Sequence, residues 1–421
     1  MSRRKMSGFP ALASVEDAFS MLVEKLTLQN PEVEYVGLEE CLDRFCGQDV
    51  FSPADVPPFD RSAVDGYAVK AADTFGASPT NPVNMKLVGT SYTGMRKDMV
   101  PAISSGQAVE IYTGAPVPEG ADAVVMAEYC KKSGDGYVEV FRQAHPFQNI
   151  SRTGEDFRMG ELVVARGTRI KSWHIGALAS LNIVKIPVYQ KLRVSVLSTG
   201  SELVELGQTP REDQIINSSK PMLKSLIVEN GCVPVDLGTV EDDVQLVASK
   251  ISEGVKVSDI VIITGGTSIG ERDIVPDAVN KAGKPGVIFH GVRIRPAKPT
   301  GAGIVDGKPV FMLSGFPVSA LIGFQLFVKP VIDMMYCHGS SGPCSVKGRL
   351  TRRVANHTAS RLFVRVRVEK TESGVVVEPL MLTGSGLLST LTKANGLLVV
   401  PEDLEGYDEG EEVEVQLLQH D

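Results

Sequence analysis

The sequence predicts a multidomain protein in which an α/β domain with a mostly parallel sheet is joined to separate β-rich domains. Three observations support this fold class. The chain has 421 residues, which is too long for one ordinary core and suggests about three domains. Between about 192 and 335, buried strands alternate with amphipathic helices, which is the pattern of βαβ units. Before and after that segment, short strands separated by turns predict small β domains.

The composition is typical of a globular protein, with 43% hydrophobic and 22% charged residues. The net charge of −8 argues against a general nucleic-acid binder, which needs a basic face. No apolar run reaches the ~18 residues of a membrane span, and no signal-peptide core follows the basic N-terminus. The six cysteines include no Cys-x-x-Cys pair, which predicts neither a zinc site nor a disulfide framework. We therefore expect a soluble, cytoplasmic protein that binds neither nucleic acid nor membranes.

The first part of the chain is expected to form one discontinuous domain with a β domain inserted in it. Apolar periodicity predicts a helix over 14–26 and another over 171–181, and a short helix is expected near 39–45. The proline-rich stretch that begins at about 49 marks the start of the insertion. The expected domains are 7–48 together with 146–188, the inserted β domain 49–145, the α/β domain 189–338 and a C-terminal β domain 345–421.

The elements of the α/β domain follow from their hydrophobic patterns. Strands are expected at 193–197 and 233–237, and helices at 218–230 and 244–253. The β-branched run Ile260–Thr264 is apolar throughout, so we expect a strand that is buried on both faces of the sheet.

The loop after this last strand is the first candidate site. Gly265 and Gly266 end the strand, and Asp273 opens a helical pattern. A glycine turn that enters a helix N-terminus offers backbone N–H groups to an anion, although a plain strand-to-helix turn explains Gly-Gly about equally well. The loops 198–202 and 238–243 follow parallel strands and should meet it at the edge of the sheet where ligands bind. The residues expected to hold a phosphorylated ligand in the glycine loop are Gly265, Gly266, Thr267 and Ser268.

Two sets of charged residues add to this prediction. The densest positive cluster lies between prolines and consists of Arg293, Arg295 and Lys298. A solvated face is the alternative, but the trapped position slightly favours phosphate binding. Acidic residues stand at four loop ends, namely Asp65, Glu202, Asp242 and Asp273. Because carboxylates beside a phosphate need a bridging cation, they predict Mg²⁺, while a cap or turn role is the alternative for each one alone.

Several common enzyme motifs do not occur in the sequence. There is no Walker motif, no Gly-x-Gly-x-x-Gly after a strand, no His-Glu-x-x-His and no Gly-x-Ser-x-Gly. Kinase-type ATPases, dehydrogenases, zinc hydrolases and serine hydrolases are therefore disfavoured.

Several segments, taken together, resemble the molybdopterin molybdenumtransferase family, the MoeA and gephyrin E-domain group. The match runs in order from about 14 to 418, and the Asp-Gly-Tyr-Ala and Thr-Gly-Ala-Pro motifs are highly specific. The segments that carry the resemblance are 62–69, 113–125, 154–156, 198–203, 264–271 and 317–321.

The resemblance implies a C-terminal β-barrel and an elongated homodimer, with each active site lying between the α/β domain of one subunit and the inserted domain of the other. It implies a reaction in which adenylylated molybdopterin and molybdate give molybdenum cofactor and AMP, with Mg²⁺ as the cofactor. Such phosphoryl chemistry depends on positioning and electrostatics and needs no nucleophilic side chain.

Site residues carry over from the family pattern by position. The implied catalytic residues are Asp65, Thr113, Glu202, Asp242 and Asp273, of which Glu202, Asp242 and Asp273 are the candidate metal ligands. The implied substrate-binding positions, beyond the glycine loop and the cations, are Ser314, Pro317, Arg361 and Ser385. The sequence departs from the family pattern at Ser314, Phe316, Ala297 and Ser219, where the pterin and metal are expected to bind.

Three alternatives remain open at this point. The α/β domain alone resembles the molybdopterin adenylyltransferase that acts one step earlier, and contact with that enzyme is also conceivable. A non-catalytic scaffold that keeps the fold is a second alternative, against which the retained polar positions argue. Tungstate could replace molybdate as the oxyanion.

Overall fold

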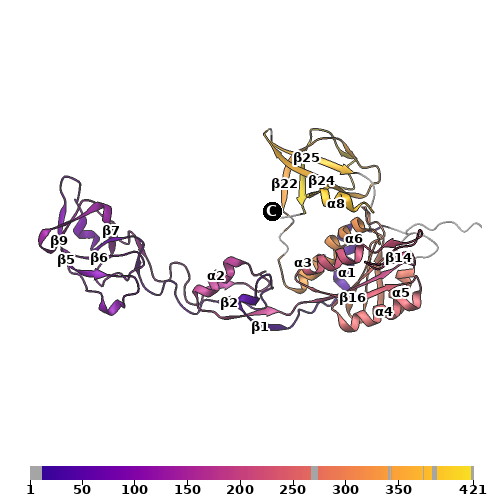
Figure 1. Cartoon of the computed structure of the whole chain (residues 1–421), viewed down its shortest axis with the longest axis horizontal. Coiled ribbons are helices and arrows are strands. Elements are labelled where there is room, and N and C mark those ends of the chain that lie inside the picture. The colour runs from indigo at the N-terminus through magenta and orange to yellow at the C-terminus, as the bar shows by residue number, and fades with distance from the viewer. Residues whose placement is uncertain are drawn as a thin grey trace, which may run out of the picture.

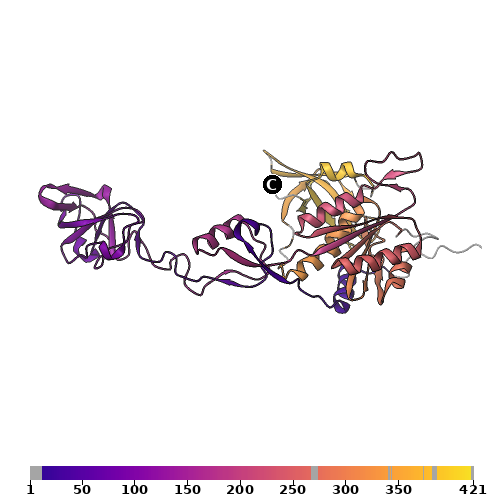
Figure 2. The ribbon, with the colours of Figure 1, turned by 60° about the horizontal axis from the view of Figure 1, so that its bottom comes forward.

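The computed structural model describes residues 12–266, 274–339, 342, 344–372, 374–381 and 386–418. The molecule is elongated (Figure 1). The inserted β domain lies at one end, a narrow middle domain follows, and the α/β and C-terminal β domains lie together at the other end. A view turned by 60° shows the same separation (Figure 2). The predicted multidomain fold class is confirmed.

The N-terminal helix α1 (Val15–Lys25) forms as predicted. The Ser14 hydroxyl caps it by accepting a hydrogen bond from the Asp17 N–H at 3.0 Å. Its buried Ala18 and Leu22 join the core of the α/β domain, although we expected residues 7–48 to pack with 146–188.

The prediction of a short helix near 39–45 is wrong. Only a 3₁₀ turn forms, at Leu38–Glu40. Asp43 has a φ of 59°, and Phe45 and Cys46 then form β-bridges to Arg169 and Val188. Pairing with the second half of the chain therefore replaces the helix.

Two distant chain segments form the middle domain. The strands β1 (Val33–Gly37) and β12 (Lys185–Tyr189) pair antiparallel, as do β2 (Val50–Phe51) and β11 (Leu162–Val164). The helix α2 (Ser172–Ser180) packs against β11. The chain therefore leaves and re-enters this domain around the insertion, and β3 (Arg61–Ser62) pairs with β10 (Ile150–Ser151) on the way.

The inserted domain is built on one six-stranded sheet. Its strands are β4 (Gly66–Val69), β5 (Val83–Ser91), β6 (Gln107–Ile111), β7 (Ala123–Met126), β8 (Cys130–Ser133) and β9 (Tyr137–Val140). They lie in the order β7-β4-β6-β5-β9-β8. Short 3₁₀ turns occur at Ala71–Thr74, Lys97–Met99, Ala127–Tyr129 and Gly134–Gly136.

The α/β domain contains a second six-stranded sheet. Its strands are β13 (Arg193–Thr199), β16 (Val233–Val240), β17 (Ile260–Thr264), β18 (Pro285–His290), β20 (Gly301–Val305) and β21 (Lys308–Leu313). The order is β16-β13-β17-β21-β20-β18. The first four run parallel, and β20 runs antiparallel to both of its neighbours, β21 and β18, so the predicted mostly parallel sheet is confirmed.

Helices cover both faces of this sheet. They are α3 (Ser219–Glu229), α4 (Val244–Val257), α5 (Ile274–Ala282), α6 (Pro317–Gly323) and α7 (Lys329–Met335), with a π-helical turn at Phe324–Val328 between the last two. Within β17, Ile260 and Ile262 join the core under α3 and α6, while Val261 and Ile263 join the core under α4 and α5. The strand is therefore buried on both faces, as its sequence predicts.

Two features deviate from the expected α/β pattern. The strand β16 continues to Val240, so Gly238 lies inside it rather than in the following loop. An excursion between β13 and α3 carries two short parallel strands, β14 (Leu203–Val204) and β15 (Ile215–Ile216). The segment Pro317–Met335 is long and apolar enough to cross a membrane, but 72% of it is buried inside the molecule, where it is a core helix.

The C-terminal domain is a small closed barrel. Its elements are β22 (Ser345–Leu350), β23 (Val354–Ala355), β24 (Arg361–Thr371), β25 (Gly374–Met381), α8 (Leu388–Lys393), β26 (Gly396–Val400), β27 (Gly406–Tyr407) and β28 (Glu412–Leu417). Closure follows because β24 pairs with both β25 and β26. A short strand of the α/β domain, β19 (Ile294–Arg295), pairs with β24 and brings the basic segment to the junction.

Candidate functional site

A cavity of about 710 Å³ lies between the α/β domain and the C-terminal barrel. Its walls come from the ends of β13 and β17, the basic segment, the loop before α6, and β24. The polar and glycine residues of interest among its walls are Thr199, Glu202, Gly265, Gly266, Arg295, Lys298, Ser314 and Arg365. The cavity therefore lies at the carboxyl edge of the parallel sheet, where the loops were expected to converge.

The glycine loop needs its glycines for steric reasons. Gly265 has a φ of +90°, and a Cβ there would lie 2.0 Å from the Thr199 carbonyl oxygen. Gly266 has a φ of +58°, and its Cβ would lie 2.8 Å from a methyl carbon of Val275. Any side chain would move the loop, so the strand end is held close to β13. The predicted residues Thr267, Ser268 and Asp273 lie outside the described residues.

Two of the predicted carboxylates stand at this edge. Glu202 lines the cavity, and its carboxylate folds back over Gly200, where a Cβ would lie 2.8 Å from Oε2. Asp242 follows β16 and accepts a hydrogen bond from the Thr199 hydroxyl at 2.6 Å. Thr199 thus links the cavity wall to the second carboxylate.

These carboxylates fit a magnesium ion. Within the described ranges, no group of three His, Cys, Asp or Glu residues could hold a metal by itself. Mg²⁺ does not need such a cage, because it is usually held by one or two carboxylates together with substrate phosphates and water. Glu202 and Asp242 supply that number of carboxylates at the edge of the sheet where the glycine loop lies.

Cations also line the cavity. Arg295 and Lys298 are exposed, whereas Arg365 on β24 is only 2% exposed. The Arg365 Nε donates to the Thr390 hydroxyl at 3.1 Å, and burial lowers the pKa of its guanidinium. An arginine keeps its proton in proteins, so the group remains a buried cation. Sequence reasoning missed Arg365, although an arginine within an apolar strand was a usable signal.

Other predicted cationic positions lie elsewhere. The Arg361 guanidinium is bound by Glu16, at 2.7 Å from Nη1 to Oε1, and by Glu402, at 3.0 Å from Nε to Oε2. It joins α1 to the barrel and does not line the cavity. Arg293 is exposed and is likewise absent from the cavity walls. Ser385 lies outside the described residues.

Three of the four positions that depart from the family pattern line the cavity, and the fourth, Ser219, contacts the lining residue Gly315. Ser219 donates to the Gly315 carbonyl at 2.7 Å, and Ser314 accepts from the Phe316 N–H at 3.3 Å. Ser314 and Phe316 line the cavity, and the buried Pro317 begins α6 directly after them. Ala297, which also lines the cavity, is buried with a φ of +82°, a left-handed conformation that favours glycine.

The remaining predicted pair lies in the inserted domain. Asp65 is exposed, and its Oδ1 accepts hydrogen bonds of 2.7 Å from both the N–H and the hydroxyl of Thr113. These two bonds hold the pKa of Asp65 below its ordinary value. Asp65 directly precedes β4, which pairs with β6 and β7, at the opposite end of the molecule from α3 and α6 (Figure 1). One chain therefore does not bring Asp65 and Thr113 to the cavity.

Comparison with known families finds three consecutive matches. Residues 13–182 match the MoeA N-terminal region (domains I and II), 195–334 match a "Probable molybdopterin binding domain", and 347–418 match the MoeA C-terminal region (domain IV).

Relatives match over the full chain. A molybdopterin biosynthesis protein of Methanocaldococcus jannaschii is 39% identical over 97% of this chain and 98% of its own length. A molybdopterin molybdenumtransferase of Bacillus subtilis is 33% identical over 93% of this chain and 91% of its own. The crystal structure of a molybdopterin biosynthesis MoeA protein from Pyrococcus horikoshii OT3 covers 97% of this chain and 100% of its own, with a TM-score of 0.82 and 32% identity. The chain belongs to the MoeA family of molybdopterin molybdenumtransferases.

Proposed function

We propose that this protein is a transferase of molybdenum cofactor biosynthesis, which inserts molybdate into adenylylated molybdopterin and releases AMP. Family membership supports the metal insertion, since the alignment covers 91% of the Bacillus subtilis relative, which is named molybdopterin molybdenumtransferase. The matches outside the α/β domain disfavour the adenylyltransferase alternative, because they cover the inserted and C-terminal domains as well.

The observation that carries the proposal is a cationic cavity in an acidic protein. The net charge is −8, yet Arg295, Lys298 and Arg365 all line one cavity. Molybdate is a dianion and the pyrophosphate of the adenylylated substrate is also negative, so both need local positive charge. The buried Arg365 supplies a charge in a site of low dielectric, where its attraction for an oxyanion is strongest.

The residues of this chain would have different roles according to their charge. The glycine loop lets a pyrophosphate approach the backbone at Gly265 and Gly266, while Lys298 and Arg365 offset the negative charge that develops as the bond to AMP breaks. Glu202 and Asp242 would hold Mg²⁺, which neutralises phosphate charge when bound. No nucleophilic side chain is required, because such chemistry rests on positioning and electrostatics.

The proposal includes a homodimer with composite sites. Asp65 and Thr113 lie at the far end of the chain from the cavity, so they can take part only if a second copy presents its inserted domain there. We further propose a soluble, cytoplasmic location and contact with the adenylyltransferase that supplies the substrate.

The test is AMP release from adenylylated molybdopterin by the full chain. We expect release that requires both molybdate and Mg²⁺ and that falls when Lys298→Ala replaces the wild type. Matched reactions without oxyanion and with tungstate measure the background and the metal preference. Absence of molybdate-dependent AMP from the folded protein would contradict the proposal and favour a scaffold.

A further inference from the structure

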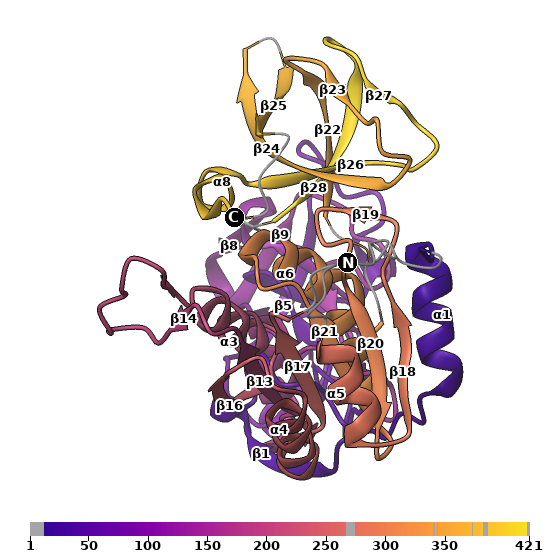
Figure 3. The ribbon, with the colours of Figure 1, turned by 90° about the vertical axis from the view of Figure 1, so that its right-hand side faces the viewer.

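Residues 200–217, the excursion between β13 and α3, form one wall of the cavity. The residues of this wall that line the cavity are Glu202, Leu203 and Ile215. The other side of the wall, with Glu205 and Leu206, faces a second cavity of about 660 Å³. Figure 3 shows the loop at β14 projecting from the body of the domain. The wall therefore has open space on both of its sides.

Apolar packing holds this wall weakly. Leu206 is 74% exposed and Ile215 is 58% exposed, while Leu203, Val204 and Ile216 are half-buried, so no large apolar side chain of the excursion is fully covered. A loop with few buried apolar contacts opens easily unless other interactions tie it to the body. Its position beside the active cavity therefore depends on polar contacts.

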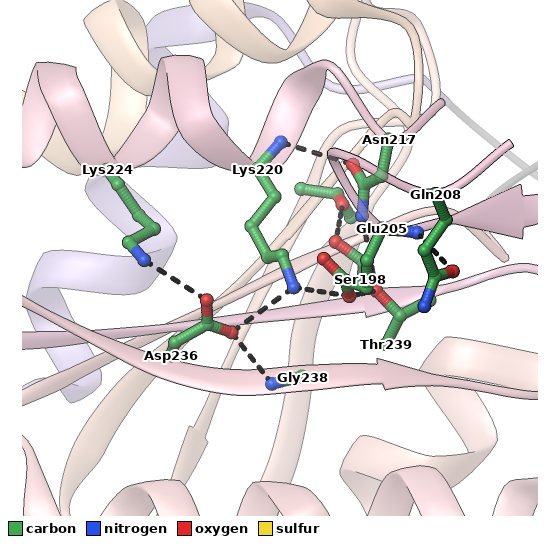
Figure 4. A network of polar contacts seen from close by, with 10 residues as sticks. Ser198, Glu205, Gln208, Asn217, Lys220, Lys224, Asp236, Gly238 and Thr239 are labelled. Atoms are coloured by element: carbon green, nitrogen blue, oxygen red, sulfur yellow. Dashed lines mark hydrogen bonds and ion pairs between the residues drawn. The ribbon is translucent and has the colours of Figure 1, made fainter. Parts of the chain in front are cut away.

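A buried lysine provides these contacts (Figure 4). Lys220 of α3 is 5% exposed, and its Nζ lies 2.6 Å from the Glu205 Oε1 and 3.3 Å from the Asp236 Oδ1. The same Glu205 oxygen accepts a 2.6 Å hydrogen bond from the Thr239 hydroxyl. The ammonium thus joins the excursion to α3 and to β16, and its own burial strengthens its attraction for the two partly exposed carboxylates.

Glu205, which the ammonium holds, directly follows β14, and hydrogen bonds around β14 and β15 connect this part of the excursion to Glu202 and to the start of α3. The Lys220 N–H donates to the Asn217 side-chain oxygen at 3.2 Å, and the Asn217 N–H donates to the Val204 carbonyl at 2.9 Å. The Ile215 N–H donates to the Glu202 carbonyl at 2.9 Å. Lys220 and Glu202 are thereby linked through the two short strands of the excursion.

Lys224 offers a natural comparison on the same helix. Its Nζ lies 3.1 Å from the Asp236 Oδ2, but its side chain is 37% exposed and this ion pair joins it to β16 and not to the excursion. Loss of Lys220 leaves Glu205 and Asp236 without their shared cation, so the ion pairs that join the excursion to α3 and β16 are lost. Loss of Lys224 leaves that shared contact intact.

We propose that Lys220 is a positioning residue that fixes the wall 200–217 and thereby holds the Glu202 carboxylate against the cavity. The catalytic consequence rests on the proposed function, whereas the anchoring of the wall does not. Lys220 lines the second cavity behind the wall and does not line the cavity that contains Glu202.

The experiment compares full-length Lys220→Met, Lys220→Arg and Lys224→Met with the wild type. Amide hydrogen exchange followed by mass spectrometry reports the wall directly, and AMP release at varied Mg²⁺ reports the site. We expect Lys220→Met to speed exchange in peptides of 200–217 about tenfold while peptides of β13 and β17 stay protected. We expect the half-saturating Mg²⁺ concentration to rise about tenfold with a smaller change in kcat.

The two other variants complete the test. Lys220→Arg should restore most of the protection and the Mg²⁺ response because it keeps the cation, and Lys224→Met should match the wild type within about twofold. Unchanged exchange in 200–217 of Lys220→Met, or faster exchange spread evenly over the domain, overturns the proposal. If Lys220→Met does not fold, Glu205→Gln, which weakens the same contact, takes its place with the same expected pattern. Inactive wild-type protein with the expected exchange pattern would instead contradict the proposed function alone.

Discussion

The cavity and the Asp65–Thr113 pair differ in almost every physical respect, although the family pattern assigns residues of one site to both. The cavity draws side chains from segments far apart in the chain and contains a buried cation, Arg365. Asp65 and Thr113 instead form a closed, exposed pair on a sheet at the other end of the molecule.

A second Asp–Thr pair in the protein shows how to interpret this difference. The Asp60 Oδ1 accepts hydrogen bonds of 2.8 Å from both the N–H and the hydroxyl of Thr153, which is nearly the geometry of Asp65 and Thr113. An Asp–Thr pair with this geometry therefore also occurs where it simply connects two loops. The geometry of a single chain supports the cavity as the proposed binding site, while the proposed role of Asp65 depends on what a second copy places against it.

The largest expected effect on AMP release comes from removing the cations that line the cavity. Lys298→Ala and Arg365→Met should each lower AMP release by about a hundredfold, because each removes a charge that opposes developing negative charge. Arg293→Ala, which changes an exposed cation outside the cavity, should lower it less than about threefold. Steady-state kinetics at saturating molybdate measure this, with circular dichroism as the check on folding. Equal losses in all three variants would mean that the cavity is not the site of charge neutralisation.

The second-largest expected effect on AMP release comes from substituting the aspartate of one of the two Asp–Thr pairs. Asp65→Asn should lower AMP release about tenfold or more, whereas Asp60→Asn should leave it within about twofold, because only the first carboxylate is proposed to meet the cavity of a partner. Both substitutions keep the side-chain shape, so thermal unfolding should change little and similarly in each. Equal losses of activity in the two variants would show that Asp65 has only a structural role.

Arg361 and Arg365 lie on the same strand, β24, but we expect the first to affect stability and the second to affect AMP release. Arg361→Met should leave AMP release unchanged and lower the free energy of unfolding by about 1 kcal/mol, as expected for a partly exposed ion pair. Its hydrogen bond holds the pKa of Glu16 below the ordinary 4.5. A carboxyl with a depressed pKa stabilises the fold above its unfolded pKa, so the difference from wild type should vanish as the pH falls through the lowered value. Denaturant titrations at several pH values check this, and a pH-independent difference would contradict it.

The smallest effect concerns Ala297. At a φ of +82° its Cβ is strained, and Ala297→Gly should raise the free energy of unfolding by up to about 1 kcal/mol. Because Ala297 lines the cavity between Arg295 and Lys298, the same variant shows whether the strain shapes the site. Thermal denaturation measures the stability, and a destabilised variant would show that the left-handed residue is not strained.

The sequence predicted most of what hydrophobic periodicity encodes. The βαβ order, the strand Ile260–Thr264 buried on two faces and the glycine turn after it were all recognisable, because each is set by a local pattern. The short helix near 39–45 was mispredicted because strand-like bridges to residues more than a hundred positions away outweigh local propensity.

The site was only partly predictable for the same reason. Arg365 reaches the cavity because β24 of the barrel pairs with β19 of the α/β domain, and no local pattern encodes that contact. The nearby Arg361 was chosen instead, although two carboxylates already bind it. Lys220 also escaped notice, since the two partners of its ammonium, Glu205 and Asp236, come from two separate parts of the chain.

Subunit complementation tests most directly whether one active site is built from two chains. A heterodimer of Asp65→Asn and Lys298→Ala subunits, purified through two different tags, would contain one site with neither change and one with both. We predict about half of the wild-type AMP release per dimer, whereas each variant homodimer stays nearly inactive. The matched heterodimer of Glu202→Gln and Lys298→Ala, whose changes both lie in the cavity, should regain nothing. No recovery in the first heterodimer would show that each chain completes its own site and would contradict the composite arrangement.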